Sequence, residues 1–240
     1  DRAMPEEHNR IVVDHLADLC CAPTATSVAN LAAECIDGER VTLTGNTVVE
    51  AVLRLVPPAD RRAELLQPLG VEADAFVLAT IHRPEYVDHP EPRAAILQPL
   101  AALPVPVVLP LHPRTAARAA SFGLSSALEQ LRVIDPLAPA PFLGIAAEAA
   151  LWVSDSGGLQ EEASVLKRPV IVVRRSTERP EVQATFAELV APGPEIGVRA
   201  RAWLDDPARR AALVELPSPY GEGRASELIA ARVLALAATA

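Results

Sequence analysis

Short runs of valine, isoleucine and leucine alternate with longer mixed stretches from about residue 76 onward. The runs have the length of strands and the stretches have the length of helices. This alternation predicts crossover units around a parallel sheet, and continuous apolar strands are typical of a sheet covered on both faces. The predicted strands are Phe76–Thr80, Val105–Leu109, Leu131–Ile134, Leu151–Ser154, Pro169–Val173 and Phe186–Val190. The predicted helices are Glu91–Leu103, Arg114–Phe122, Pro141–Ala150, Leu159–Leu166 and Pro194–Asp205.

The two ends of the chain have a different pattern. A proline followed by two glutamates, with apolar residues at helical spacing, predicts a helix over Pro5–Leu19. Further predicted elements are a helix from Thr24 or Thr26 to Glu34, a strand Val41–Thr44, a helix Thr47–Val56 and a last helix from Glu222 onward. The run Pro57–Asp60 marks a boundary. We therefore divide the chain into residues 1–58, a sheet region 59–218 and a C-terminal helix 219–240.

Composition narrows the function classes. The chain has 240 residues, half of them hydrophobic, and a net charge of −9, which argues against a general nucleic-acid or acidic-membrane binder. Aromatic residues make up 3%, too few for a platform that stacks bases. Cys20, Cys21 and Cys35 fit neither a disulfide framework nor a metal site. With no apolar run of membrane-spanning length and no signal peptide, we expect a cytoplasmic protein.

Polar residues follow the predicted strands, where ligands of parallel sheets lie. After Leu151–Ser154 come Asp155, Ser156, Gly157 and Gly158, and then a helix start. Glycines admit close approach of a ligand to the backbone, and free N–H groups at a helix start attract phosphate. Glu162, one turn on, has the chemistry to accept hydrogen bonds from ribose hydroxyls. An ordinary capped turn explains the same residues, and the pattern alone leaves both interpretations open.

A histidine and an arginine follow each of two further predicted strands. His82 and Arg83 follow Phe76–Thr80, and His112 with Arg114 follow the next strand, which favours a shared anionic ligand over surface pairs. The segment after Pro169–Val173 holds three arginines, a threonine and two glutamates within eight residues. Its Arg179 has the chemistry for a bidentate diphosphate contact. The alternative is a solvated charge cluster.

Together these motifs resemble the UDP-N-acetylglucosamine 2-epimerase family. They occur in family order along nearly the whole chain: Met4–Arg10, Ala22–Thr24, Thr44–Thr47, Thr80–Arg83, His112–Pro113, Asp155–Glu162, Thr177–Glu181 and Pro219–Ser226. The resemblance implies an α/β fold of two Rossmann-like domains facing each other across a cleft, as in GT-B glycosyltransferases. Residues 1–58 would then be a remnant of the N-terminal domain, 59–218 the UDP-binding domain and 219–240 a crossing helix. We expect most of the N-terminal domain, with its arginine loop and acidic residues, to be lacking.

The resemblance also implies roles for individual residues. Ser156, Gly157, Gly158 and Arg179 would hold the diphosphate, and Glu162 the ribose. Phe142 and the backbone of Leu137 would lie beside the uracil. His82 would contact sugar and diphosphate as a catalytic residue, and Glu6 would be a catalytic carboxylate. Arg83 and His112 are further candidates for anion contacts. Neither a redox cofactor nor a metal is implied.

The implied activity is a bacterial one, the interconversion of UDP-GlcNAc and UDP-ManNAc for cell-surface polysaccharide synthesis. UDP would be eliminated to give 2-acetamidoglucal and then added back. This chain alone would bind UDP but turn over little. One alternative is a non-catalytic or split UDP-sugar-binding subunit that needs a partner. Another is a hydrolysing epimerase that releases ManNAc and UDP. A homodimer, or association with the missing domain, is expected.

Overall fold

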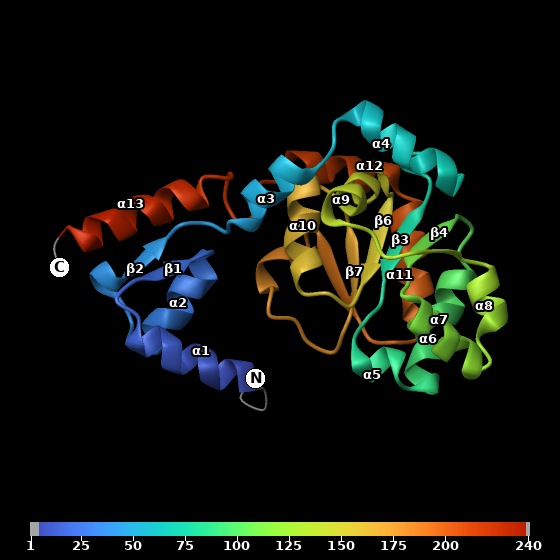
Figure 1. The fold of residues 1–240 in the computed structure, drawn as a ribbon, viewed down its shortest axis with the longest axis horizontal. Helices are drawn as coiled ribbons and strands as arrows, with labels where there is room; N and C mark the ends of the chain where they lie inside the picture. The colour runs from blue at the N-terminus through green and yellow to red at the C-terminus, as the bar shows by residue number, and fades with distance from the viewer. Residues whose placement is uncertain (1–4, 239–240) are drawn as a thin grey trace. The chain divides into compact units, whose positions relative to one another are not determined.

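The computed structural model describes residues 5–238, which fall into two compact units (Figure 1). Unit 1 comprises the chain up to Leu53 together with the segment from Ser218 onward. Unit 2 comprises Arg54–Pro217. The interpretation of residues 1–58 as part of a larger domain stays a prediction.

Unit 2 is built on a parallel sheet of six strands. The strands are β3 (Val77–Thr80), β4 (Val107–Pro110), β5 (Arg132–Ile134), β6 (Leu151–Ser154), β7 (Val170–Val173) and β8 (Ala187–Val190). Every strand pairing in this sheet is parallel, and the order across the sheet is β5-β4-β3-β6-β7-β8. All positions of β6 and β7 are buried, as expected for strands covered on both faces. This confirms the predicted Rossmann-like sheet.

The strand order reverses once, between β3 and β6. The chain first builds outward from β3 through β4 to β5, and then returns to the other side of β3 to lay down β6, β7 and β8. In register, Val77 faces Leu151 and Thr80 faces Ser154. The loops that leave β3 and β6 therefore diverge from neighbouring positions. In open parallel sheets, such a reversal point opens the crevice where ligands bind.

Helices flank this sheet (Figure 1). They are α4 (Ala59–Leu66), α5 (Pro84–Val87), α6 (Pro90–Ala101), α7 (Pro113–Ser121), α8 (Ser125–Glu129), α9 (Pro139–Glu148), α10 (Gly158–Leu166), α11 (Glu195–Leu204) and α12 (Pro207–Ala212). Trp152, which is 1% exposed, fixes α9 to β6 because its indole N–H donates to the Ala146 carbonyl at 2.8 Å. The prolines that precede or open several of these helices suit first-turn positions, where no N–H partner is lost.

Unit 1 has a small two-stranded sheet and four helices within its described residues. Its elements are α1 (Pro5–Leu16), β1 (Cys20–Ala22), α2 (Ala25–Ala33), β2 (Val41–Leu43), α3 (Val48–Leu55), which crosses the unit boundary, and α13 (Ala225–Ala237). The strands pair in parallel, with Cys20 opposite Val41. Their apolar core contains Cys20, Ala22, Leu31 and Ile36.

Two predicted helices have an end displaced by three residues in the structure. The first ends at Leu16 and not at Leu19, because the Arg40 guanidinium donates to the carbonyls of Asp14, His15 and Ala17 and so caps the last turn. Cys20–Ala22 then forms a strand. The last helix begins at Ala225 and not at Glu222, because Gly221 and Gly223 have φ values of 93° and 86°, outside the helical region.

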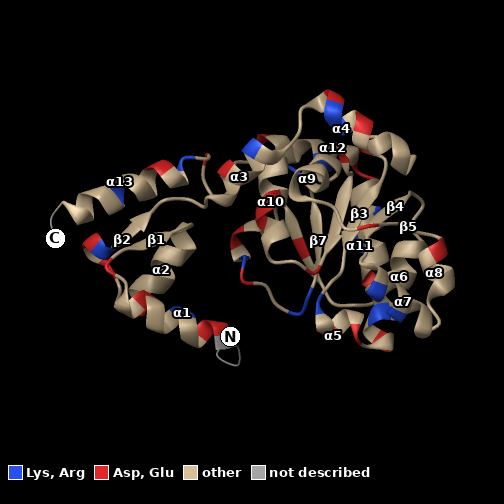
Figure 2. Cartoon of the chain, in the orientation of Figure 1, with Lys and Arg blue, Asp and Glu red and all other residues tan. Residues whose placement is uncertain are grey.

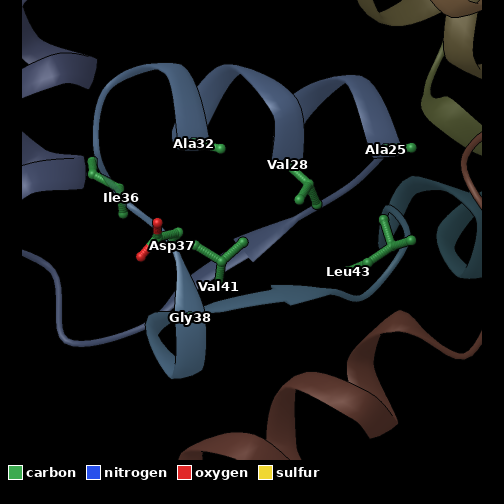
Figure 3. Close-up of a pocket in the computed structure, with 8 residues that line it drawn as sticks. All are labelled: Ala25, Val28, Ala32, Ile36, Asp37, Gly38, Val41 and Leu43. Carbon is green, nitrogen blue, oxygen red and sulfur yellow. The ribbon is translucent and has the colours of Figure 1, made fainter.

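An apolar hollow of about 300 Å³ lies in unit 1 beside α2 and β2 (Figure 3). Its lining consists of Ala25, Val28, Ala32, Ile36, Asp37, Gly38, Val41 and Leu43. Asp37 is its one charged side chain. No site residue predicted from the sequence lines it. As a separate finding, no helix within residues 5–238 combines the length and apolar character needed to cross a bilayer.

The end of α10 carries the one lysine of the sequence. Lys167 adopts the left-handed conformation (φ 58°) that terminates many helices. Its ammonium donates to the Leu216 carbonyl at 2.6 Å and lies 5.4 Å from the centre of the Phe186 ring. Burial lowers the pKa of this amine. Lys167 therefore marks the end of α10 opposite to the glycine turn.

Candidate functional site

Hydroxyl groups connect the ends of β3 and β6 at the reversal point. Thr80 Oγ1 and Ser154 Oγ, from facing residues, lie 2.7 Å apart. Ser154 Oγ also accepts a hydrogen bond from the backbone N–H of Ser156 at 3.0 Å. These contacts fix the start of both loops, since each hydroxyl joins a strand end to a neighbouring segment.

Asp155 is fully buried, with 0% of its side chain exposed. One carboxylate oxygen accepts from the backbone N–H groups of His82 and Arg83, at 2.9 and 2.8 Å. The other lies 2.8 Å from Nδ1 of His82, whose ring is 64% exposed. The hydrogen bond to Asp155 raises the pKa of His82 above its usual value, although partial burial opposes it. The pair thus combines a buried carboxylate with an accessible imidazole.

The glycine turn runs through Ser156 and Gly157 into α10, which begins at Gly158. Gly157 has helical dihedral angles, so its backbone does not require glycine. The missing side chain matters because a Cβ there would collide with a carboxylate oxygen of Glu178. That carboxylate forms an ion pair with the buried Arg174 at 2.7 Å. An anionic group held by an arginine therefore lies directly against the turn.

The loop after β7 is tied to α10 along its length. Thr177 Oγ1 donates to Gln160 Oε1 at 2.8 Å, and the backbone N–H of Arg179 donates to Thr177 Oγ1 at 3.1 Å. The Arg179 guanidinium forms a close ion pair with the buried Glu161. Figure 2 shows basic and acidic residues following one another along this loop. The loop is therefore held onto the glycine-turn helix, and its Arg174, Glu178 and Arg179 are paired with protein groups.

Glu162 differs from its neighbour Glu161. Its Oε2 atom is buried and has no hydrogen-bond partner among the described residues. Burial, with a smaller contribution from the charge of Glu161, raises its pKa to about 7. A buried carboxylate oxygen without a partner is costly in a folded protein, so it suggests a place for a donor from a ligand. Within residues 5–238, no group of three or more His, Cys, Asp or Glu is arranged to hold a metal ion.

The remaining predicted residues of unit 2 lie at neighbouring strand ends. Leu137 follows β5, and Phe142 lies in the first turns of α9; both side chains are half-buried. His112 follows β4 and its Nδ1 accepts from the backbone N–H of Arg114 at 3.2 Å, which caps α7. Arg83 Nε donates to the Asp155 carbonyl at 3.0 Å. These residues therefore all lie on loops and helix starts that follow the strands.

Glu6 belongs to unit 1, in the first turn of α1. Its side chain is exposed. The neighbouring Glu7 is bound by Arg10 at 2.9 Å, and Arg10 also pairs with Asp14 and Glu34. The two neighbouring glutamates therefore differ: Glu7 is held in an ion pair by Arg10, whereas the carboxylate of Glu6 is exposed.

Sequence reasoning missed four polar residues of this site: Asp155, Glu161, Arg174 and Glu178. Asp155 stands next to Ser156 in the motif, so adjacency was a usable signal. Nothing in the sequence next to Glu161 and Glu178 marks them, because their arginine partners lie 18 and 4 residues away. Arg174 is buried, which its position among three arginines does not reveal.

The parallel sheet with its single reversal and the glycine turn beside it define a Rossmann-like α/β protein. A family model described as UDP-N-acetylglucosamine 2-epimerase matches residues 1–234, and the chain belongs to this family. The resemblance and the fold class predicted from the sequence are thereby confirmed. The individual site residues stay predictions.

Three similar proteins illustrate the relationship. The UDP-N-acetylglucosamine 2-epimerase of Methanococcus maripaludis is 33% identical over 80% of this chain and 55% of its own length. The Methanocaldococcus jannaschii enzyme, solved with UDP-GlcNAc and UDP, superposes with a TM-score of 0.81 at 32% identity, over 98% of this chain and 66% of that chain. The UDP-2,3-diacetamido-2,3-dideoxy-D-glucuronate 2-epimerase of Pseudomonas aeruginosa is 32% identical over 95% of this chain and 62% of its own length. The chain thus spans between half and two thirds of these relatives.

Proposed function

We propose that the chain binds the uridine diphosphate moiety of UDP-GlcNAc and serves in a 2-epimerase that interconverts UDP-GlcNAc and UDP-ManNAc. The observation that carries this proposal is the glycine turn at the start of α10, placed at the reversal of the sheet beside the Asp155–His82 pair. The structure of the M. jannaschii relative with UDP-GlcNAc and UDP supports it.

The diphosphate would lie against Ser156, Gly157 and Gly158. Free N–H groups at the start of α10 and its helix dipole favour an anion there. Arg174 and Arg179 supply guanidinium groups, which Glu178 and Glu161 bind in the structure described here. A diphosphate would compete with these carboxylates for the arginines. The local arginines thus offset a chain whose overall charge of −9 repels anions.

The nucleoside would occupy the neighbouring strand ends. The buried Oε2 of Glu162 is suited to accept a hydrogen bond from a ribose hydroxyl. Phe142 and the backbone of Leu137 would contact the uracil, one offering an apolar ring and the other backbone polar groups. These contacts distinguish a nucleotide from inorganic diphosphate.

The reaction would proceed by elimination and re-addition. A base takes the proton from C2, the electron pair forms the C1–C2 double bond, and the C1–O bond breaks with its electrons leaving on UDP. A proton that has exchanged with solvent is then delivered to the other face of C2, while a UDP oxygen re-forms the bond to C1. His82, in its protonated form, would stabilise the departing diphosphate. We assign the role of a base to Glu6, the exposed glutamate of its pair.

The binding test uses calorimetry with UDP, UMP and uridine, followed by a crystal of the UDP complex. We expect UDP to bind most tightly, since the diphosphate makes the charged contacts, and we expect its density beside Ser156–Gly158. Density at any other place would overturn the proposal. Equal affinity for uridine and UDP would overturn the diphosphate assignment.

The reaction test follows UDP-GlcNAc by NMR in deuterated water. Elimination and re-addition place a solvent deuteron at C2 of UDP-ManNAc, whereas an epimerisation without loss of the C2 proton does not. Free ManNAc as the main product would indicate the hydrolysing reaction. UDP-2,3-diacetamido-2,3-dideoxy-D-glucuronate is the matched alternative substrate, because a relative of similar identity is named for it.

A further inference from the structure

The buried carboxylate of Asp155 makes contacts that join two loops distant in sequence. It reaches His82 and Arg83, 73 and 72 residues away, through their backbone N–H groups. It also contacts the imidazole of His82. The pairing of β3 with β6 brings the two segments together, so the loop bearing His82 is attached to the segment that opens the glycine turn.

The chemistry of this contact defines which ring nitrogen of His82 is available. An ionised carboxylate accepts hydrogen bonds and donates none. Nδ1, 2.8 Å from Asp155 Oδ1, must therefore carry the proton in the neutral ring. Nε2 is then the atom left for a ligand, on a ring that is 64% exposed. A histidine without such a partner samples both tautomers and several ring orientations.

We propose that Asp155 is the positioning residue that sets the tautomer and orientation of His82, so that Nε2 faces the bound diphosphate. The diphosphate part of this statement rests on the proposed function. The tautomer part rests on the geometry alone. Because the same carboxylate also holds the backbone of His82 and Arg83, the ring is fixed relative to Ser156–Gly158 as well.

Two other charged side chains, Arg83 and Glu85, influence the pKa of His82, and each has a smaller effect than Asp155. Arg83 lies beside the ring, with Nε bound to the Asp155 carbonyl and Nη1 3.3 Å from Glu85. Arg83 lowers the pKa of His82 and Glu85 raises it, while the hydrogen bond that the ring N–H donates to Asp155 has the largest effect. Removing the charge of Asp155 should therefore change the titration of His82 more than any other single substitution in this region.

The deciding measurement is NMR of the histidine ring nitrogens in the chain without nucleotide, with the His82→Gln variant to assign the signals. We expect Nδ1 to be protonated in the neutral ring, and the titration midpoint to exceed the ordinary value of about 6.5. In Asp155→Asn, the amide oxygen still accepts from the backbone while the amide N–H₂ faces the ring. The neutral tautomer should then switch to Nε2–H, and the midpoint should fall below that of the unsubstituted chain.

Asp135→Asn is the matched control, because it removes the same charge at the end of the β5 strand and leaves the pair intact. It should leave the tautomer and titration of His82 unchanged. An Nε2–H tautomer in the unsubstituted chain would overturn the proposal, and this result does not depend on whether Asp155→Asn folds. An unchanged tautomer and midpoint in a folded Asp155→Asn variant would overturn it too.

UDP affinity against pH provides a readout that a merely structural role would not change. Relative to His82→Gln, the unsubstituted chain should lose affinity as pH rises through the midpoint of His82, and Asp155→Asn should lose it at lower pH. If the unsubstituted chain and Asp155→Asn lost UDP affinity over the same pH range, the positioning role of Asp155 would be wrong. Failure of UDP to bind at all would instead overturn the proposed function, while the nucleotide-free NMR measurement would still decide the role of Asp155.

Discussion

At the scale of single residues, the buried carboxylate of Glu162 leads to a prediction about stability and to one about ligand binding. Glu162 lies in the second turn of α10 with one carboxylate oxygen buried and unpartnered among the described residues. Its pKa, raised by burial to about 7, means that the folded chain favours the protonated form. The contribution of this group to stability is therefore complete below about pH 4.5 and is lost as pH rises through about 7.

Replacing Glu162 by Gln should remove this pH dependence. At pH 8 we expect the variant to have a free energy of unfolding about 1–3 kcal/mol higher than the unsubstituted chain, the usual cost of a buried unsatisfied group. At pH 4 the two should be equal, because both side chains are then uncharged. Urea unfolding at the two pH values measures the difference, and equal stability at both would contradict the raised pKa.

UDP binding should also change the protonation of Glu162. If ribose hydroxyls donate to Glu162, UDP binding stabilises its ionised form and releases a proton near pH 7. Calorimetry in buffers of different ionisation enthalpy counts that proton. We expect the unsubstituted chain to release more protons than Glu162→Gln, since protons from UDP itself are common to both. Identical release would remove Glu162 from the ribose site.

Arg179 should contribute to UDP affinity through its charge. Arg179→Ala is expected to weaken UDP binding by about 1.5–3 kcal/mol, the range for a charge-assisted hydrogen bond. Because the substitution also leaves Glu161 unpaired, the double variant with Glu161→Gln separates the two effects. Arg175→Ala, an exposed arginine of the same loop, is the matched control and should change affinity little. If UDP affinity were unchanged both in Arg179→Ala and in the double variant, Arg179 would not be a diphosphate contact.

At the scale of elements, the sequence predicts most where burial is uniform. The strand Leu151–Ser154 has the predicted bounds, and all four of its residues are buried. Helix ends that depend on distant groups could not be predicted. Arg40 terminates α1 from 23 to 26 residues away. The same limit applies to the site: the strand ends identified His82, but its partner Asp155 is supplied by the sheet order.

The last helix shows such a distant partner as well. The carboxylate of Glu50, which is 8% exposed, accepts from the backbone N–H of Ser226 at 2.7 Å and from its hydroxyl, near the start of α13. Glu50→Ala should lower the free energy of unfolding by about 1–3 kcal/mol, because it leaves the helix start uncapped. Glu227→Ala, which removes an exposed carboxylate from the same turn, should have no measurable effect in the same urea titration. Equal effects would contradict the cap.

At the scale of the whole molecule, the predicted roles divide between the two units. Leu137, Phe142, Ser156–Gly158, Glu162 and Arg179 all belong to unit 2. Glu6 belongs to unit 1. Nucleotide binding and proton transfer are therefore assigned to separate parts of the chain.

This division predicts that binding survives without unit 1. A fragment of residues 54–217 should unfold cooperatively and bind UDP within about threefold of the full chain, since a difference of ~0.6 kcal/mol covers the loss of remote contacts. Circular dichroism and calorimetry measure both properties. A folded fragment that no longer binds UDP would show that unit 1 contributes to the nucleotide site.

The left-handed end of α10 has a practical consequence. Because Lys167 is the one lysine in this sequence and burial lowers the pKa of its amine, an acylating dye at mildly alkaline pH would label it in preference to any other side chain of residues 1–240. Nine helical residues separate it from the glycine turn, or roughly 14 Å along the axis. A fluorophore there would report nucleotide binding optically without touching the phosphate contacts.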